Sequence, residues 1–336
     1  MTNSAEPPVR RRRPRARAVL AVLTVLVLLC WAANSSRLHG PGEGRPTTLA
    51  HRGLGQTFDL AGIENDTCTA ERIHPPEHAY LENTIAGMRA AFDAGADVVE
   101  LDVHITRDDR FAVFHDWEVD CRTDGRGTTR DHTMAELRRL DIGYGYTADD
   151  GATHPFRGTG AGLMPSLDEV FAEFPDEELL IHVKSDDPAE GELLAEHLAR
   201  LPGDRLAAVT VYGGDAPIAA LRRELPGLRT MSKATLRDCL VRYAAVGWSG
   251  YVPAACAGTQ LHVPEKIGPW LWGWPHLFVS RMAEAGTRVV LVGGSGDWSA
   301  GFDGPQDLER VPEGFTGTVW TNRADVVAPL VAERGR

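Results

Sequence analysis

The five cysteines of this sequence include no Cys-x-x-Cys pair, so a zinc site built from thiolates is not expected. After the N-terminal segment, acidic residues outnumber basic ones. The 336 residues carry a net charge of −12, of which residues 1–33 contribute +5, so the remainder carries −17. Such an acidic body excludes nucleic acid as a partner, because it would repel the phosphate backbone. No internal repeat interrupts residues 48–336, which are therefore expected to form one domain.

The longest uncharged run covers only 16 residues, 18–33, and it follows six arginines within residues 10–17. A basic tail before an apolar stretch is typical of a membrane anchor or a secretory signal, although 16 residues are slightly short for a helix that spans a bilayer. We expect a cytoplasmic tail over residues 1–17, a transmembrane anchor or signal sequence over 18–33, and a linker over 34–47. The remaining domain is then extracytoplasmic at the cell membrane, or secreted if the segment is cleaved.

Four cysteines remain outside the apolar run, and an even number in an exported protein indicates disulfides. They are Cys68, Cys121, Cys239 and Cys256. Three pairings are open in principle. Joining Cys68 to Cys121 and Cys239 to Cys256 requires the least reorganisation of the chain.

From residue 48 onward, short apolar segments alternate with longer amphipathic ones. This alternation predicts parallel α/β units, and about eight of them predict a single-domain TIM (β/α)8 barrel with its active site at the carboxyl ends of the strands. The expected strands cover residues 47–51, 97–105, 110–114, 179–184, 206–212, 228–232, 288–293 and 317–322. The expected helices cover residues 82–94, 133–140, 166–174, 189–201, 215–224 and 276–285.

The strand at 97–105 carries the most informative pattern, because Glu100, Asp102 and His104 alternate with apolar residues. Side chains two residues apart share one face of a strand, so the two carboxylates would point into the barrel together. Their mutual repulsion would be relieved by a hard cation, and Mg²⁺ and Ca²⁺ prefer oxygen ligands of this kind. The alternative is a salt-bridged pair at the barrel rim.

Two histidines stand where predicted strands end: His51 is the last residue of the first strand, and His115 follows residues 110–114. Imidazole titrates near neutral pH, so two of them across one barrel mouth could act as an acid and a base. Arg52 could bind a phosphate through its planar set of donors.

The sequence resembles the glycerophosphodiester phosphodiesterases. The similar pieces occur in the family's order and span nearly all of residues 48–336. They are LAHRG at 49–53, ENT at 82–84, GADVVELDVHITRDDRFAVFHD at 95–116, MPSLDEV at 164–170, LLIHVKS at 179–185 and VWTNRAD at 319–325. The resemblance implies a TIM barrel, a divalent cation (usually Mg²⁺ or Ca²⁺), a role in glycerophospholipid metabolism, and release of sn-glycerol 3-phosphate and an alcohol.

The resemblance also implies roles for individual residues. His51 and His115 become the catalytic acid–base pair, Arg52 a phosphate ligand, and Glu100 and Asp102 metal ligands. Glu82, the first residue of the ENT piece, would help hold either Arg52 or the ligands of the metal in place.

The chain departs from the family where a Glu-x-Lys strand usually supplies another metal carboxylate, because it has His182 and Lys184 at these positions. We expect His182 to be a metal ligand and Lys184 to place positive charge near the phosphate. Imidazole suits softer divalent ions better than Mg²⁺ or Ca²⁺, so a different divalent ion is an open alternative. Among the tryptophans, Trp320 is the expected substrate contact.

Two other functions remain open at this point. The same residues could serve a lysophospholipase D that acts on membrane lysolipids, or the barrel could bind headgroups without catalysis. The expected partners are thus a small glycerophosphodiester or a lysolipid, and a membrane through the N-terminal segment.

Overall fold

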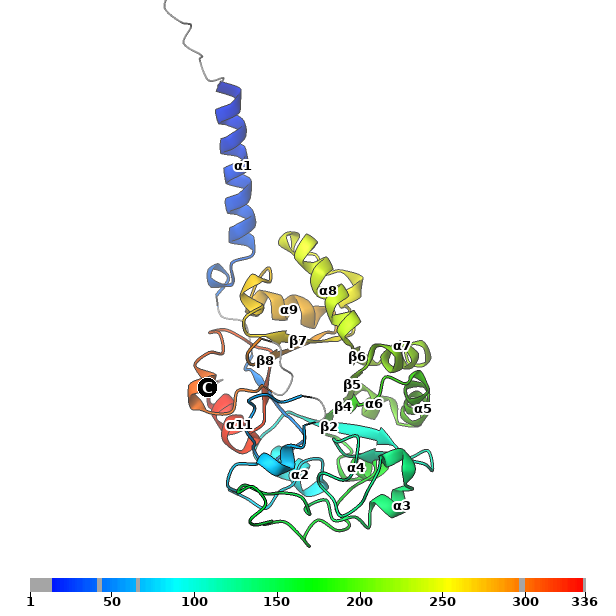
Figure 1. Ribbon diagram of the computed structural model, residues 1–336. Helices are drawn as coiled ribbons and strands as arrows, with labels where there is room; N and C mark the ends of the chain where they lie inside the picture. The colour runs from blue at the N-terminus through cyan, green and yellow to red at the C-terminus, as the bar shows by residue number, and fades with distance from the viewer. Residues whose placement is uncertain (1–13, 41–43, 65–66, 296–299, 335–336) are drawn as a thin grey trace, which may run out of the picture.

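Parallel strands curve into a nearly closed barrel in this computed structural model, which describes residues 14–40, 44–64, 67–295 and 300–334 (Figure 1). Neighbouring strands follow the order β6-β5-β4-β2-β1-β9-β8-β7, and a bridge between Thr230 and Thr259 joins the two ends of this order. The predicted barrel is therefore confirmed. The barrel strands are β1 (Thr47–Ala50), β2 (Val98–Ile105), β4 (Glu178–Val183), β5 (Val209–Gly213), β6 (Arg229–Met231), β7 (Gln260–Pro264), β8 (Arg288–Val292) and β9 (Thr318–Thr321).

Two strands differ from the prediction. The segment predicted at 110–114 forms β3 (Phe111–Val113), which pairs antiparallel with the end of β2 and is not a barrel strand. The barrel instead uses β7, which the sequence did not reveal. In β7, the buried side chains of Gln260 and His262 point away from the apolar layer. These polar residues and the proline at the end of the strand weaken the apolar pattern by which a strand is predicted from sequence.

Helices surround the barrel and cover its apolar outer layer (Figure 1). On β2 the apolar residues Val99, Leu101 and Val103 are fully buried in this layer, as predicted. Burying each aliphatic side chain contributes about 1.5–3 kcal/mol. The helices are α1 (Pro14–Ala33), α2 (Ile85–Asp93), α3 (Met134–Leu137), α4 (Leu167–Glu173), α5 (Pro188–Leu198), α6 (Gly203–Ala207), α7 (Asp215–Glu224), α8 (Lys233–Val246), α9 (His276–Glu284), α10 (Pro305–Leu308) and α11 (Ala324–Glu333).

Both predicted disulfides are confirmed. Cys68 pairs with Cys121, with 5.7 Å between their Cα atoms, and Cys239 pairs with Cys256, with 4.7 Å between theirs. The first bond ties together two loops beside the barrel, and the second fastens α8 to the segment that leads into β7. Cross-links of this kind stabilise a fold mainly by restricting the unfolded chain.

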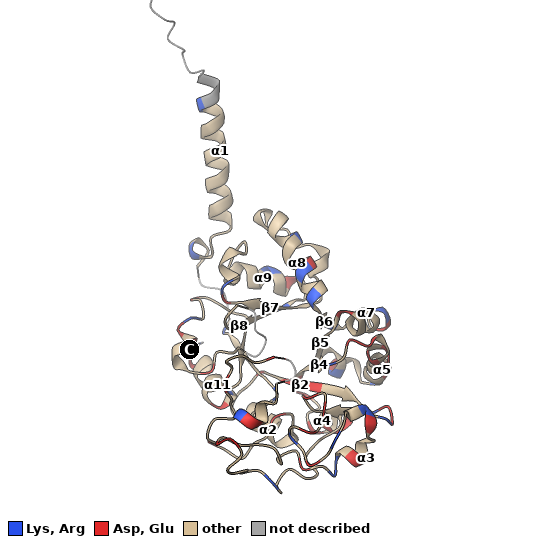
Figure 2. Ribbon diagram, in the orientation of Figure 1, with Lys and Arg blue, Asp and Glu red and all other residues tan. Residues whose placement is uncertain are grey.

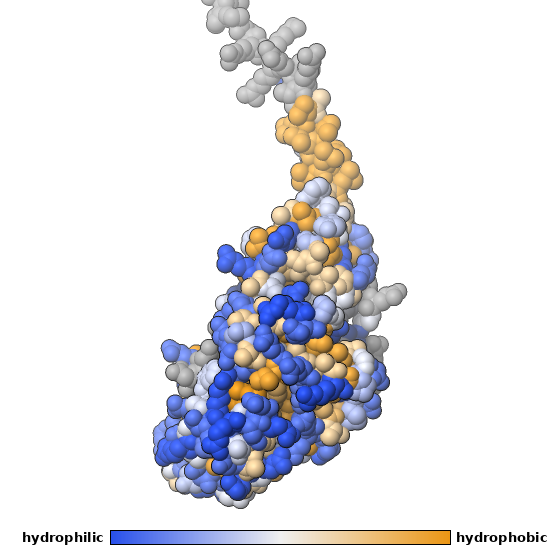
Figure 3. Space-filling model, turned by 90° about the vertical axis from the view of Figure 1, so that its right-hand side faces the viewer, coloured by the Kyte–Doolittle hydropathy of each residue, from blue (hydrophilic) through white to orange (hydrophobic). Residues whose placement is uncertain are grey.

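The N-terminal segment forms α1, which extends away from the barrel and exposes its apolar side chains (Figure 1, Figure 3). The described part of α1 carries almost no charge, whereas charged residues lie on the helices and loops of the barrel (Figure 2). Across the described residues, no helix is both long and apolar enough to cross a membrane, so the transmembrane anchor predicted at 18–33 is not supported. The uncharged run itself has only 16 residues. Most of the predicted basic tail, residues 1–13, lies outside the described residues.

Part of the predicted linker packs on the barrel. A short helical turn, Ser36–Leu38, follows α1, and the Ser36 hydroxyl donates a hydrogen bond of 2.7 Å to the carbonyl of Gly273. The described residues before 41 thus have a defined contact with the loop that precedes α9.

Candidate active site

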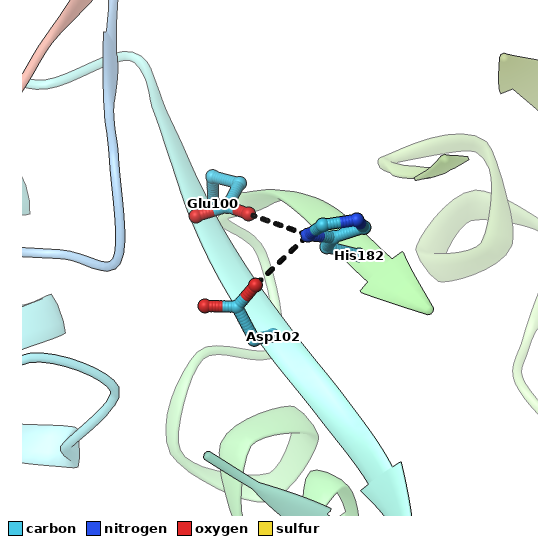
Figure 4. A group of neighbouring side chains, drawn as sticks. All are labelled: Glu100, Asp102 and His182. Atoms are coloured by element: carbon cyan, nitrogen blue, oxygen red, sulfur yellow. Dashed lines mark hydrogen bonds and ion pairs between the residues drawn. The ribbon is translucent and has the colours of Figure 1, made fainter. Parts of the chain in front are cut away.

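Glu100 and Asp102 project from β2 toward His182 on the neighbouring strand β4 (Figure 4). The register of the two strands places Asp102 directly beside His182. His182 Nδ1 lies 2.9 Å from Asp102 Oδ1 and 3.9 Å from Glu100 Oε1. One ligand atom from each residue lies within 4.8 Å of the others, so the three residues form a candidate metal site. The predicted metal ligands therefore meet in space.

Burial makes two neighbouring carboxylates costly without compensating charge. Glu100 is fully buried, and burial together with Asp102 raises its pKa to about 8. Its carboxylate accepts hydrogen bonds from the Tyr212 hydroxyl at 2.7 Å and the Arg52 backbone N–H at 2.9 Å. Burial would also raise the pKa of Asp102, but Lys184 is the strongest of the charges that hold it well below its usual range. Two carboxylates and one imidazole are a donor set that fits a divalent cation.

Arg52 follows β1 in a left-handed backbone conformation, with φ of 57°. Its Nη1 donates to Glu82 Oε1 at 2.8 Å, and its Nε lies 3.3 Å from Asp102 Oδ2. The next residue must be glycine, because a Cβ on Gly53 would lie 2.9 Å from the backbone nitrogen of Met88. This turn aims the guanidinium across the barrel mouth, and Glu82 holds it there. The predicted support of Arg52 by Glu82 is thus present in the structure.

His51 lies between an amide and a guanidinium. Its Nδ1 is 2.7 Å from Asn322 Oδ1, and its Nε2 accepts a hydrogen bond from Arg52 Nε at 3.2 Å. Burial, reinforced by the charge of Arg52, holds the pKa of His51 well below its usual range. The ring packs against Trp320, with 4.7 Å between the ring centroids. Trp320 is fully buried, so it supports the His51 ring from below.

His115 has a carboxylate partner instead. Its Nδ1 lies 2.6 Å from Asp116 Oδ1, while Arg122 Nε donates to the other oxygen of Asp116 at 2.8 Å. The Lys184 ammonium is 3.1 Å from His115 Nε2. Burial and the charges of Arg52 and Lys184 lower the pKa of His115. Both predicted histidines therefore reach the same polar centre, from different strands and with different partners.

An open pocket of about 370 Å³ borders this centre on the side of His51 and Arg52, and the three candidate metal ligands, His115 and Lys184 are not among its lining residues. Its lining includes His51, Arg52 and Glu82, together with Phe58 and Asn322. Trp320 is not among the residues that line it. The pocket thus exposes one imidazole and the guanidinium to a small molecule.

Residues 51–211 match the Glycerophosphoryl diester phosphodiesterase family. This match covers just under half of the chain, which is similar to the family over that stretch. A Glycerophosphodiester phosphodiesterase from Caldanaerobacter subterraneus subsp. tengcongensis is 37% identical over 103 residues, which are 31% of this chain and 39% of that protein. A relative of the same name from Bacillus subtilis is 30% identical over 156 residues, which are 46% of this chain and 44% of that protein. The chain therefore spans less than half the length of these curated relatives.

Solved structures of the family share the fold at low sequence identity. The glycerophosphoryl diester phosphodiesterase domain of an uncharacterized Mycobacterium tuberculosis protein aligns with a TM-score of 0.60 at 18% identity, over 85% of this chain and 99% of that one. An Oleispira antarctica phosphodiesterase, solved in complex with the product sn-glycerol-3-phosphate, aligns with a TM-score of 0.52 at 18% identity. That alignment covers 86% of this chain and 97% of the other. The fold shared with these structures thus extends well beyond residue 211.

Several residues of the site were not identified from the sequence. Asn83 Nδ2 donates to Asp102 Oδ2 at 3.0 Å, and Tyr212 holds Glu100. Asn322 contacts His51, and its place two residues after Trp320 on the same strand face was the available signal. Asp303, which contacts Asn322, comes from an irregular segment with no periodicity that could have indicated it.

Proposed function

We propose that this chain is a metal-dependent phosphodiesterase that hydrolyses glycerophosphodiesters to sn-glycerol 3-phosphate and an alcohol. The observation that carries the proposal is the convergence of two imidazoles and two cationic side chains on a cluster of potential metal ligands. The match of residues 51–211 to the Glycerophosphoryl diester phosphodiesterase family supports the reaction class, and the product complex of the Oleispira antarctica phosphodiesterase supports glycerol 3-phosphate as the product.

The positive charges of the site are placed where they would stabilise a negatively charged phosphodiester. Glu100, Asp102 and His182 would hold the cation, which when bound supplies positive charge to stabilise the reacting phosphate. Arg52 offers its planar donors to the phosphate oxygens, and Lys184 adds a second positive charge. Both cations are nearly buried, with side-chain exposures of 7% and 9%, so water screens them weakly.

The partners of the two histidines suggest different roles. A general acid must hold a proton before the reaction. The Asp116 carboxylate beside His115 favours the charged imidazolium, although burial and the charges of Arg52 and Lys184 leave the pKa of His115 lowered. A general base must be neutral, and the uncharged amide of Asn322 beside His51 does not stabilise a positive charge in the same way. His51 thus removes a proton from the attacking oxygen, and His115 protonates the leaving alcohol. The attacker is water or the neighbouring glycerol hydroxyl.

The mixed donor set suggests which ion acts. Ca²⁺ favours an all-oxygen shell of six to eight ligands, whereas Mn²⁺ accepts carboxylate and imidazole together. Because His182 replaces an oxygen ligand with nitrogen, Mn²⁺ should bind at least as well as Mg²⁺ and better than Ca²⁺.

The two disulfides suggest where the domain works. Such bonds persist in oxidising compartments and are rare where thiols are kept reduced. We therefore propose that the catalytic barrel works outside the cytoplasm. Protease added to intact cells should degrade the barrel, and full protection until the cells are lysed would reject this location.

A substrate panel tests the proposed reaction. The purified chain is offered glycerophosphocholine, glycerophosphoethanolamine, glycerophosphoglycerol and lysophosphatidylcholine with Mn²⁺ or Mg²⁺, and glycerol 3-phosphate and lysophosphatidic acid are measured. Release of glycerol 3-phosphate from the first three is expected. Turnover of lysophosphatidylcholine alone would identify a lysophospholipase D instead, and binding without turnover would identify a headgroup-binding barrel.

A further inference from the structure

Asp303 lies on a segment that runs back along β9 and is fixed there by its neighbours. The backbone N–H of Phe302 donates to the carbonyl of Trp320 at 2.9 Å, and the Phe302 side chain is fully buried in the core. On the other side, the backbone N–H of Asp303 donates to Asp307 Oδ2 at 2.9 Å. The backbone therefore presents the Asp303 carboxylate at a defined position beside the end of β9.

This carboxylate holds both nitrogens of Asn322. Asp303 Oδ1 accepts from the Asn322 backbone N–H at 2.7 Å, and Asp303 Oδ2 accepts from Asn322 Nδ2 at 2.9 Å. The Thr321 hydroxyl donates to Asp303 Oδ1 at 3.1 Å. An ionised carboxylate can only accept hydrogen bonds, so the amide nitrogen of Asn322 must face Asp303 and the amide oxygen must face away.

The orientation of the amide decides which ring nitrogen of His51 carries hydrogen. Asn322 Oδ1 can only accept, and it lies 2.7 Å from His51 Nδ1, so the hydrogen must be on Nδ1. On the other side of the ring, Arg52 Nε can only donate, and it lies 3.2 Å from His51 Nε2. Two independent contacts therefore require the same tautomer.

The contact between Asp303 and Asn322 requires a residue without a side chain at Gly301. A Cβ on Gly301 would lie 2.5 Å from Asp303 Oδ1 and 3.0 Å from Asn322 Nδ2. The first distance is too short for a real contact and the second is tight, so a side chain at this position would separate the carboxylate from the amide.

We propose that Asp303 is a positioning residue that, through Asn322, fixes the neutral His51 ring as the Nδ1–H tautomer, so that the lone pair lies on Nε2, which faces Arg52 Nε. Asp303 also lines the pocket beside His51, and the role assigned to it here acts through Asn322. The proposal deepens the acid–base mechanism proposed above, but the tautomer is a property of the resting protein and can be measured without catalysis.

Nitrogen NMR of the full chain, labelled at histidine and kept in Mg²⁺, distinguishes the two neutral tautomers by the shifts of their ring nitrogens. The His51 signals are assigned by their loss in His51→Gln. The wild-type ring is expected to show protonated Nδ1 and unprotonated Nε2. A wild-type Nε2–H tautomer would overturn the proposal without any further variant.

Asp303→Asn keeps the size of the side chain but replaces one carboxylate oxygen with an NH₂ group. This group can only donate, whereas both nitrogens of Asn322 need an acceptor. We expect the His51 signals to shift toward a mixture of tautomers, and kcat to fall about tenfold or more while KM changes little, as for the loss of one charge-assisted hydrogen bond. Gly301→Ala should produce the same two changes through a different residue. A normal tautomer and normal kcat in Asp303→Asn would contradict the proposal.

Gln306→Ala is the control, because it alters an exposed residue of the same segment and leaves the contacts of Asp303 in place. Its tautomer and kcat should match the wild type, and equal losses in this variant would reduce Asp303 to a structural role. Failures of the two proposals are distinguishable. A correct tautomer without hydrolysis rejects the phosphodiesterase function, whereas hydrolysis with the wrong tautomer rejects only the role of Asp303.

Discussion

His182 stands directly opposite Asp102 on the adjacent parallel strand, and its Nδ1 lies 2.9 Å from the Asp102 carboxylate. Glu100 completes the cluster from the same face of β2. A nitrogen donor thus occupies one corner of a site whose other two donors are carboxylates. This arrangement has a direct consequence for the choice of ion.

His182→Glu should change the preference of the site among ions. The wild type is expected to be stabilised against heat more by Mn²⁺ than by Ca²⁺, because imidazole favours transition ions. A third carboxylate should raise the stabilisation by Ca²⁺ and Mg²⁺ relative to Mn²⁺. Thermal unfolding with each ion measures this order, with His182→Ala as the control that removes the ligand atom. An unchanged order in His182→Glu would show that His182 is not a ligand.

The proposed roles of the histidines predict different responses to the leaving group. His51→Ala and His115→Ala should each lower kcat by about 10²–10⁴, the usual contribution of acid–base catalysis. A p-nitrophenyl phosphodiester needs little help from an acid, so it should restore much of the rate of His115→Ala and little of that of His51→Ala. The opposite pattern would exchange the two roles.

Arg52→Lys tests whether the planar guanidinium matters beyond its charge. Lysine keeps the charge but loses the paired donors that reach Glu82 and the phosphate, so we expect kcat/KM to fall about 10–100-fold. The matched control is Arg107→Lys, which makes the same exchange at an exposed arginine that pairs with Glu136 and should leave kcat/KM unchanged. Equal activity of Arg52→Lys and wild type would exclude a paired contact with the phosphate.

The second disulfide is expected to contribute to stability and not to chemistry. A Cys239→Ser/Cys256→Ser double variant should lose about 2–4 kcal/mol of unfolding free energy, because the closed loop no longer restricts the unfolded chain. Its kcat should stay close to that of the wild type, since α8 carries none of the proposed catalytic residues. Denaturant unfolding and steady-state kinetics measure the two effects, and normal stability would contradict the prediction.

The sequence predicted those parts of the site that depend on one strand. The alternation in β2 placed Glu100 and Asp102 on one face, and the positions of His51 and His115 after strands brought them toward the same centre. It did not predict β7, because Gln260 and His262 weaken the apolar pattern that identifies strands.

Contacts between segments that are far apart in the chain could not be predicted from the sequence either. Asp303 reaches Asn322 only because its segment folds back along β9 through Phe302. Trp320 was expected to contact substrate, whereas the structure places it beneath the His51 ring. Alternation along a strand gives the face on which a side chain lies, but not the depth at which it is covered.

The most direct test of the central claim is glycerol 3-phosphate release from glycerophosphocholine after treatment with EDTA and after return of Mn²⁺, with Glu100→Gln measured alongside. We predict that EDTA abolishes release, that Mn²⁺ restores it, and that Glu100→Gln stays inactive in both conditions. Full activity of the wild type in EDTA, or normal activity of Glu100→Gln, would contradict a metal-dependent site at this cluster.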